Sequence, residues 1–395
     1  MKNWTVLISG ASIAGPALAL WLARYGFRPT VVEIAPQLRL GGQAVDFRGE
    51  THFKVLERMG VLEDLRTLQT GGTAMRFVDE SGRKLMELPA DFAGGDIEVL
   101  RGDLTRVLYE HTTDTTEYLF GDSITALVET PDGVDVAFAS GRHRRFDLVI
   151  GADGVHSNVR RLAFGPEEQY VSHLGYYVAT WTVPNDLGLG RDTRHYNVPG
   201  KMASVGGDHR DPAKATAFVA WASPVLDYDR HDLDQQRRIL ADVFGSLGWQ
   251  VPYLLAALPD ASDLYFDAIC RVDIDSWWQG RVALLGDAAW GATIGGMGNG
   301  TAIVGAYALA SELAAAHGDH TVAFPRFDTL FRGFARRCQK GGNSTGPFLA
   351  PRRATMIRLR NGLLNRPLLM DMMLRMGKDR TEAIDLPNYH EQSMR

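Results

Sequence analysis

Residues 5–33, which read TVLISGASIAGPALALWLARYGFRPTVVE, decide the fold of this chain. The continuous apolar run from Thr5 to Ser9 predicts a buried strand, and the spacing of apolar residues from Ile13 to Tyr25 predicts a helix that Gly26 ends. A second buried strand is predicted over Thr30 to Ile34. Together these elements make a β-α-β unit, which is typical of a parallel sheet covered by helices.

Residues 4–23 contain no charged side chain, and twenty such residues are long enough to span a membrane. However, Gly10, Ser12, Gly15 and Pro16 interrupt the segment, and helical spacing begins only after them. A strand, a tight turn and a buried helix therefore explain the run better than a membrane span or a signal peptide, and we expect no membrane association.

The composition is that of a soluble globular protein, with 45% apolar and 23% charged residues. The net charge of −5 and the lack of a basic run interleaved with aromatic residues argue against a nucleic-acid partner. Residues 326–366 hold ten Lys or Arg and one acid, Asp328, a basic bias that we interpret as solvated helix faces. Two cysteines, Cys270 and Cys338, fit a reducing cytoplasm, and no motif predicts a metal site.

Beyond the first unit, the sequence predicts helices near 51–59 and 103–112, a hairpin within 74–100, and short strands over 117–150. Residues 173–223 alternate in polarity and are rich in aromatic residues, which predicts a second, antiparallel sheet and a candidate floor for a substrate. Helices are expected over 232–258, strands over 265–273 and 281–285, and helices from there to the end of the chain.

The glycine-rich turn G-A-S-I-A-G, Gly10 to Gly15, lies between a predicted strand and a predicted helix, and Glu33 ends the next strand. Such a turn frees backbone N–H groups at a helix N-terminus for a pyrophosphate, and a carboxylate in that position accepts ribose hydroxyls. Ser12 replaces the middle glycine of the dinucleotide fingerprint, so its side chain must avoid the phosphates, bond to them or cap the helix. An ordinary β-α turn remains the alternative.

Two later segments strengthen the dinucleotide hypothesis. The segment 147–160, DLVIGADGVHSNVR, brings Asp153 and Gly154 into a loop after a buried strand. Further on, GDAA at 286–289 follows another strand, and GGMGNG at 295–300 leads into a long helix, so backbone donors are again offered to an anion or a ring edge. Each loop alone could be a structural turn, but three in this order are difficult to explain that way.

This order of motifs resembles the FAD-dependent group A flavoprotein monooxygenases, the class of para-hydroxybenzoate hydroxylase and the tetracycline-inactivating hydroxylases, over residues 3–345. The resemblance implies an α/β fold, in which a Rossmann-like FAD-binding domain of the glutathione reductase type is interleaved with an antiparallel β-sheet substrate domain and followed by a helical C-terminus. We predict an FAD-binding domain of 1–73, 97–171 and 270–340, a substrate domain of 74–96 and 172–269, and a helical segment of 341–395.

The resemblance also assigns residues to the cofactor, with Arg160 supporting the loop at Asp153 and Gln43 and Arg48 near the isoalloxazine ring. The expected FAD contacts are Gly10, Ser12, Ile13, Ala14, Gly15, Glu33, Gln43, Arg48, Arg101, Ile124, Asp153, Gly154, Asp287, Gly298 and Asn299. Backbone groups at Gly296 and Gly298 are expected at the reacting edge of the flavin, and the candidate substrate contacts are Trp181, Phe218, Trp221 and Trp290. Trp290 stands where the family commonly has His, and no proline occurs between Ala288 and Gly300, so the pocket shape departs from the family pattern.

In this family NAD(P)H reduces non-covalent FAD, O2 adds to give a C4a-hydroperoxide, and its distal oxygen passes to the substrate. We therefore predict hydroxylation of an electron-rich aromatic or polyketide-like small molecule by a cytoplasmic monomer or homodimer, with NADPH or NADH binding transiently. Oxygen insertion beside a ketone, epoxidation, and a flavoprotein that binds a ligand without turnover remain alternatives. The sequence does not choose between them.

Overall fold

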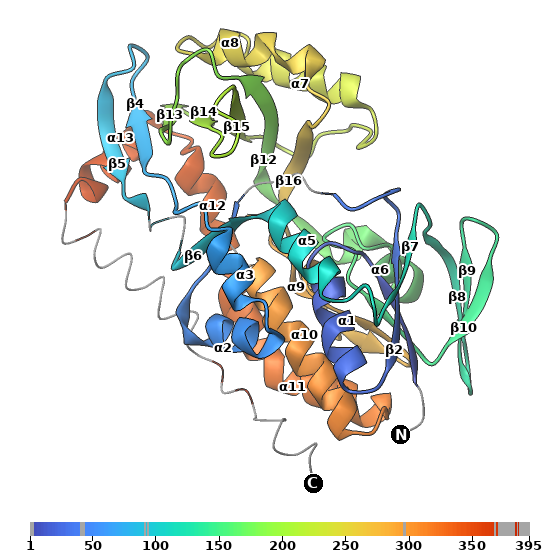
Figure 1. Cartoon of the computed structure of the whole chain (residues 1–395). Coiled ribbons are helices and arrows are strands. Elements are labelled where there is room, and N and C mark those ends of the chain that lie inside the picture. Colours follow the sequence, from blue (N-terminus) through green and yellow to red (C-terminus); the bar gives the residue numbers. More distant parts are fainter. Residues whose placement is uncertain are drawn as a thin grey trace.

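The computed structural model describes residues 4–39, 44–90, 92, 95–294, 298–366, 369, 384 and 386. Figure 1 shows two parts, one above the other, each built on its own large sheet. In the lower part a six-stranded sheet has the strand order β17 (Trp278–Gln279), β18 (Val282–Leu284), β11 (Leu148–Gly151), β1 (Thr5–Ser9), β2 (Arg28–Glu33) and β7 (Glu117–Phe120). Its strands are parallel except β17.

Helices bury both faces of this parallel sheet, because each of its central strands is apolar throughout. The N-terminal unit is confirmed: β1 is followed by α1 (Ala14–Arg24) and then by β2. One continuous core joins the sheet to its helices, namely α1, α2 (Gly49–Met59), α3 (Leu62–Thr67), α5 (Arg101–Glu110), α6 (Asn158–Ala163), α9 (Asp287–Trp290), α10 (Gly298–Ala315) and α11 (His320–Gln339). Among the described residues, no helix has the length and apolar character that a membrane crossing requires.

Two small sheets complete the lower part. A three-stranded antiparallel sheet contains β8 (Ile124–Thr130), β9 (Gly133–Phe138) and β10 (His143–Phe146). A two-stranded sheet pairs β3 (Ala44–Phe47) with β6 (Ile97–Leu100), so β6 does not extend the hairpin predicted within 74–100. Only β4 (Met75–Val78) and β5 (Lys84–Leu88) form that hairpin, and both join the upper sheet.

The upper sheet has seven strands in the order β16 (Tyr265–Val272), β12 (Val171–Pro184), β15 (Lys214–Ala222), β14 (Lys201–Gly207), β13 (Thr193–Val198), β4 and β5. It is mixed rather than purely antiparallel as expected, because β4 comes from a distant part of the sequence and pairs in parallel with β13. One face packs on α7 (Leu233–Phe244) and α8 (Val251–Ala256), while α12 (Gly342–Leu349) and α13 (Ala354–Leu364) cover the other. Figure 1 shows α7 and α8 above the sheet, at the end remote from α10 and α11.

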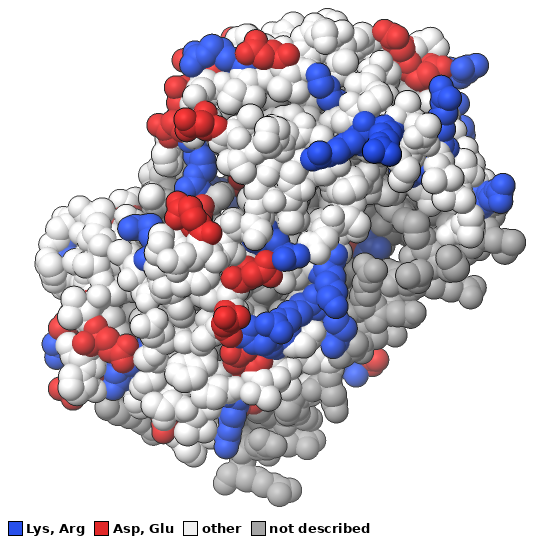
Figure 2. All heavy atoms as spheres, turned by 180° about the vertical axis from the view of Figure 1, so that it is seen from behind, with Lys and Arg blue, Asp and Glu red and all other residues white. Residues whose placement is uncertain are grey.

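Lys, Arg, Asp and Glu side chains are scattered in separate groups over the back of the molecule (Figure 2). One band of Lys and Arg crosses the middle of this face, and acidic side chains border it. An extended basic face without acids, which a nucleic-acid backbone would require, is not seen in this view.

Candidate active site

The turn between β1 and α1 has the geometry of an anion cradle. Gly10 has a φ of +106°, and a Cβ there would lie 2.5 Å from the carbonyl oxygen of Ala152 in the neighbouring strand. A Cβ at Gly15 would overlap the carbonyl oxygen of Gly10. Both glycines therefore allow a close backbone approach that other residues would prevent. The helix N-cap, Ile13, provides no side-chain cap, and the first turn contains no acid, so backbone donors remain for a phosphate group.

Ser12 and Arg101 meet at this turn from two separate motifs. The Nη2 group of Arg101, the first residue of α5, donates to the Ser12 hydroxyl at 3.0 Å. The serine therefore does not cap the helix, which was one of the roles considered for it. Arg101 adds an exposed positive charge beside the uncapped N-terminus of α1, where a pyrophosphate would bind.

Glu33 ends β2 with its side chain 6% exposed. One carboxylate oxygen accepts the Ala11 N–H at 2.9 Å, and the other accepts the Ala35 N–H at 3.0 Å. Glu33 therefore holds the glycine-rich turn in place. The second of these oxygens also accepts the Arg39 guanidinium at 3.2 Å, whereas the oxygen that faces Ala11 has further acceptor capacity, so a ribose hydroxyl could also bind there.

Asp287 is the first residue of the short helix α9, where its side chain is half-buried and its Oδ1 atom is buried. Burial raises the pKa of this carboxyl, and the positive charge of Arg101 partly opposes that rise. Its Oδ1 atom has no hydrogen-bond partner among the described residues. Gly298 lies directly beside it, because a Cβ at that position would be 3.0 Å from Oδ1. The structure thus brings Ser12, Arg101, Asp287 and Gly298 together from four separate segments.

Asp153 stabilises the start of the glycine-rich turn through a hydrogen bond to Ser9. Its carboxylate accepts the Ser9 hydroxyl at 3.2 Å and the Val159 N–H at 3.0 Å, and it also accepts the Ser157 hydroxyl. Burial raises the pKa of Asp153, and these hydrogen bonds partly offset the rise. Its side chain therefore holds the ends of this loop and of β1 together, and cofactor contact at Asp153 stays a prediction. Gly154, in contrast, faces open space.

Arg160 connects this loop to α9. Its side chain is fully buried, and its guanidinium donates to the carbonyl oxygens of Ala288 at 2.9 Å and Val155 at 2.5 Å. These two hydrogen bonds fit the supporting role expected for Arg160. Because Ala288 follows Asp287 directly, Arg160 links the second and third motifs.

The other residues expected to bind the cofactor have partners within the protein, lie at the start of a helix, or fall outside the described residues. The carbonyl of Ile124 already accepts the side-chain amide of Asn158 at 2.6 Å. Arg48 pairs with Asp46 at 2.5 Å and donates to the Phe92 carbonyl at 2.8 Å. Asn299 lies in the first turn of α10, and Ala14 opens α1. Gln43 and Gly296 lie outside the described residues.

The aromatic residues proposed as substrate contacts divide between the two faces of the upper sheet. Trp181 and Trp221 are 1% and 2% exposed and pack in the core under α7 and α8, and the Trp181 indole donates to the Leu254 carbonyl. Phe218 lies on the opposite face, with α12 and α13. Trp290 is 4% exposed and packs against Trp277 at a ring-centroid distance of 4.5 Å. We therefore treat Trp181, Trp221 and Trp290 as core residues and keep Phe218 as a substrate candidate.

Sequence reasoning missed three groups close to the site. Burial opposes protonation of His156, but hydrogen bonds to Asp267 and Glu167 raise its pKa to about 9, and its ring connects the loop of Asp153 to β16. Tyr265 begins β16 within electrostatic range of Arg101 and Asp287. His52 is 2% exposed and lies against Gly300. The histidine at 156 stands inside a quoted motif and could have been noticed, whereas the contacts of Tyr265 and His52 are purely tertiary.

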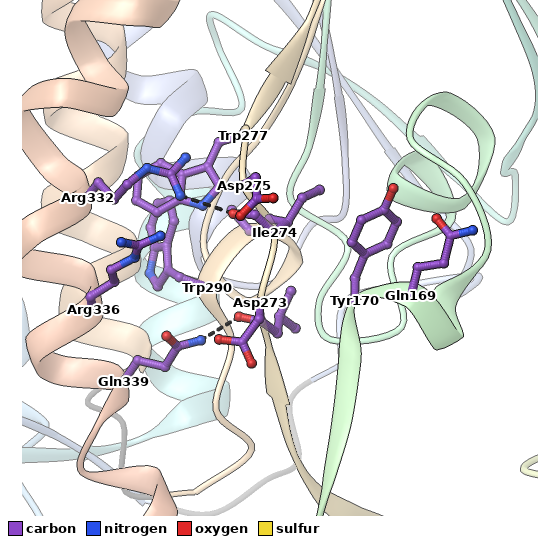
Figure 3. A pocket seen from close by; sticks show the side chains of 12 residues that line it. Gln169, Tyr170, Asp273, Ile274, Asp275, Trp277, Trp290, Arg332, Arg336 and Gln339 are labelled. Atoms are coloured by element: carbon purple, nitrogen blue, oxygen red, sulfur yellow. Dashed lines mark hydrogen bonds between the residues drawn. The ribbon is translucent and has the colours of Figure 1, made fainter.

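A cavity of about 160 Å³ lies between α11 and the chain that follows β16 (Figure 3). Arg332 and Arg336 reach into it from α11, opposite Asp273 and Asp275, and Trp277 and Trp290 border it. It is separate from the Ser12–Arg101–Asp287 cluster, since it opens behind α9. The described residues include no group of three or more His, Cys, Asp or Glu arranged to hold a metal ion.

Residues 3–176 match the family model described as FAD binding domain. A flavin-dependent monooxygenase from Legionella longbeachae is 40% identical over 347 residues, which cover 86% of this chain and 88% of that protein.

Solved structures agree with these sequence matches. The crystal structure of the tetracycline destructase Tet(51) superposes with a TM-score of 0.87 at 34% identity, covering 98% of this chain and 100% of that one. The HpxO protein of Klebsiella pneumoniae, solved with FAD and uric acid, has a TM-score of 0.74 at 22% identity, covering 95% of this chain and 97% of that chain, which supports the fold alone.

Proposed function

The chain belongs to the flavin-dependent monooxygenases, and from this premise we propose that it uses non-covalently bound FAD, NAD(P)H and O2 to hydroxylate an electron-rich aromatic or polyketide-like small molecule. The observation that carries the proposal is the convergence of Ser12, Arg101 and Asp287 around an uncapped helix N-terminus. A tight turn, a cation and a buried carboxylate are complementary to a pyrophosphate with its adjoining hydroxyl groups.

The described residues fit FAD on independent grounds. The backbone approach at Gly10 and Gly15 leaves no room for side chains in the turn, and Oδ1 of Asp287 is a buried acceptor to which no described residue donates. A hydroxyl of the cofactor would satisfy that acceptor, which would otherwise be costly to bury. Glu33 would bind ribose hydroxyls, the first turn of α1 and Arg101 the pyrophosphate, and the N-terminal residues of α10 the ring edge.

When bound and reduced, FAD supplies the electrons that activate O2 for transfer to the substrate. The protein's own contribution is binding, orientation and exclusion of water. The turn at Gly10 and the helix of Asp287 would hold neighbouring parts of the cofactor, its pyrophosphate and the hydroxyl groups beside it, because Arg101 lies close to both. Arg160 fixes α9 from behind, and the apolar face of the upper sheet around Phe218 provides a dry surface for an aromatic substrate.

The substrate class is supported by the solved relative at 34% identity, which is described as a tetracycline destructase. Tetracyclines therefore belong in the test beside simpler phenols and other polyketides. The purified protein should be yellow, and acid precipitation should release its flavin, because the described cofactor contacts are hydrogen bonds and charges.

The decisive experiment measures NADPH and NADH oxidation under air with each compound, together with the product mass. A true substrate should accelerate oxidation of the nucleotide and gain the mass of one oxygen atom. The same mixtures without O2 serve as the control. A protein that cannot be loaded with FAD, or that oxidises no nucleotide with any compound, would contradict the proposal.

A further inference from the structure

Arg360, on α13, is a half-buried cation to which no carboxylate among the described residues is paired. Its guanidinium donates to neutral oxygens only, namely the Phe348 carbonyl at 2.5 Å, the Asn197 amide at 2.8 Å and the Asn361 amide at 3.0 Å. No carboxylate of the described residues pairs with it, and burial alone lowers its pKa to about 10. The side chain therefore remains charged near neutral pH, in a place where an unpaired charge is costly.

Aromatic rings surround this cation. The guanidinium carbon lies 4.5 Å from the ring centroid of Phe77 and 5.5 Å from that of Phe348. Phe348 in turn stacks on Phe92 at 5.7 Å, and the carbonyl of Phe92 accepts a hydrogen bond from Arg48. A cation–π contact, a ring stack and one hydrogen bond thus connect Arg360 to Arg48, which the family resemblance places near the isoalloxazine ring.

His195 is a second polar group without a partner at the same place. It stacks on Phe77 at a ring-centroid distance of 4.9 Å, is 5% exposed, and neither ring nitrogen has a hydrogen bond among the described residues. It faces the same side of the sheet as Phe218, because His195 pairs with Ser204 and Ser204 pairs with Phe218. Two strand spacings separate His195 from Phe218, about 10 Å, which is close to the length of two or three fused rings.

We propose that Arg360 and His195 form the polar end of the substrate site and bind an acidic oxygen of the substrate, an ionised carboxyl, phenol or enol, while Phe348 and Phe92 contact its rings. This proposal deepens the proposed function and rests on it. The anion would give the cation of Arg360 a counter-charge, and a neutral imidazole can donate one hydrogen bond to the same group. Aromatic faces around the cation favour a flat, conjugated ligand.

The test compares two aromatic probes that differ in charge and by one methyl group: a hydroxynaphthoate with adjacent hydroxyl and carboxyl groups, and its methyl ester. Isothermal titration calorimetry of the purified protein measures their dissociation constants directly. We expect the wild type to bind the acid more tightly than the ester. Arg360→Gln should weaken acid binding about 10- to 100-fold and leave ester binding nearly unchanged, because it removes a charge-assisted contact. His195→Leu should weaken acid binding about 2- to 10-fold, since a neutral hydrogen bond is weaker.

Two further variants separate recognition from structure. Arg360→Lys keeps the charge and should retain part of the preference for the acid, whereas Arg358→Gln changes an exposed arginine of the same helix and should alter neither affinity. If Arg360→Gln weakens acid and ester binding equally, Arg360 only stabilises the packing of α13 and the proposal is overturned. A wild type that binds neither probe, or that binds both equally, also overturns it. FAD content, read separately from flavin absorbance, shows whether the proposed function itself has failed.

Discussion

The glycine-rich turn allows a matched test, because two glycines of the N-terminal unit have similar backbone angles and different surroundings. Gly10 has a φ of +106° and Gly26 a φ of +82°, but only Gly10 has backbone atoms close to the position of a Cβ. Gly26→Ala therefore measures the conformational cost alone, about 1–2 kcal/mol for an L-residue in this region. Gly10→Ala carries that cost and a steric one.

The steric part follows from the neighbouring strand. A Cβ at position 10 would lie 2.5 Å from the Ala152 carbonyl oxygen, and the Ala152 N–H is already bonded to the Ser9 carbonyl at 2.8 Å. Since the strand end is fixed, the turn itself has to move by roughly 1 Å, a change of the size that overpacking imposes at about 1–3 kcal/mol. The N–H groups of the turn would then leave hydrogen-bonding range of a phosphate.

FAD titrated into apoprotein, followed by quenching of flavin fluorescence, measures the outcome. We expect Gly10→Ala to weaken FAD binding about 10- to 150-fold, the equivalent of about 1.5–3 kcal/mol for charge-assisted hydrogen bonds, and Gly26→Ala to leave it nearly unchanged. Thermal unfolding of both apoproteins checks that each still folds. Equal FAD affinity in the two variants would show that this turn does not hold the cofactor.

Four further changes test the site and the fold. Glu33→Ala should weaken FAD binding by about 1–3 kcal/mol in the same titration, since it removes ribose acceptors and frees the turn; an unchanged affinity would remove Glu33 from the site. Asp287→Ala should lose FAD during gel filtration more readily than the exposed Asp234→Ala, and equal retention would contradict its placement. Gly298→Val places a side chain against Asp287 and should raise the peroxide formed per NADPH consumed. An unchanged ratio in a variant that keeps its FAD would show that this loop lies away from the reacting oxygen. Burial, aided by the charge of Arg360, lowers the pKa of His195 to about 3. Below about pH 6.5 the unfolded chain therefore binds a proton at this residue that the folded chain does not, and the free energy of unfolding falls by up to about 1.4 kcal/mol for each unit by which the pH is lowered. Urea unfolding of His195→Leu should show a free energy of unfolding that depends less steeply on pH in the acid range.

The parts of the site that lie within one stretch of sequence could be predicted from it. The strand, turn and helix around Gly10 were predictable because the turn needs glycine for local reasons, a positive φ and a close backbone approach. Glu33 follows at the end of the next strand for an equally local reason. The meeting of Arg101 with Ser12 was implied by family resemblance and not by any local pattern, since 89 positions separate them.

The substrate contacts show why tertiary placement is harder to predict. Phe218 and Trp221 stand three positions apart in one strand, so a regular strand must point them to opposite faces. This odd spacing is visible in the sequence and already indicates that Phe218 and Trp221 do not line the same pocket. Which face carries α7 and α8, and which carries α12 and α13, depends on how distant segments pack, and here the two tryptophans fell on the side of α7 and α8.

The same reasoning explains why Arg360 could not be singled out before the fold was known. In the sequence it is one of ten basic residues between positions 326 and 366, and solvated helix faces account for most of them, including the exposed Arg336, Arg353 and Arg358. Others are neutralised or covered, such as Arg332, which pairs with Asp328 and lies 4.4 Å from the ring centroid of Trp277. Arg360 differs because its described neighbours are aromatic rings and neutral oxygens, and a half-buried cation to which the described residues offer no carboxylate is what a binding site for an anion requires. The functional information of this basic segment therefore lies in Arg360, whose charge is half-buried among aromatic rings and neutral oxygens of the described residues.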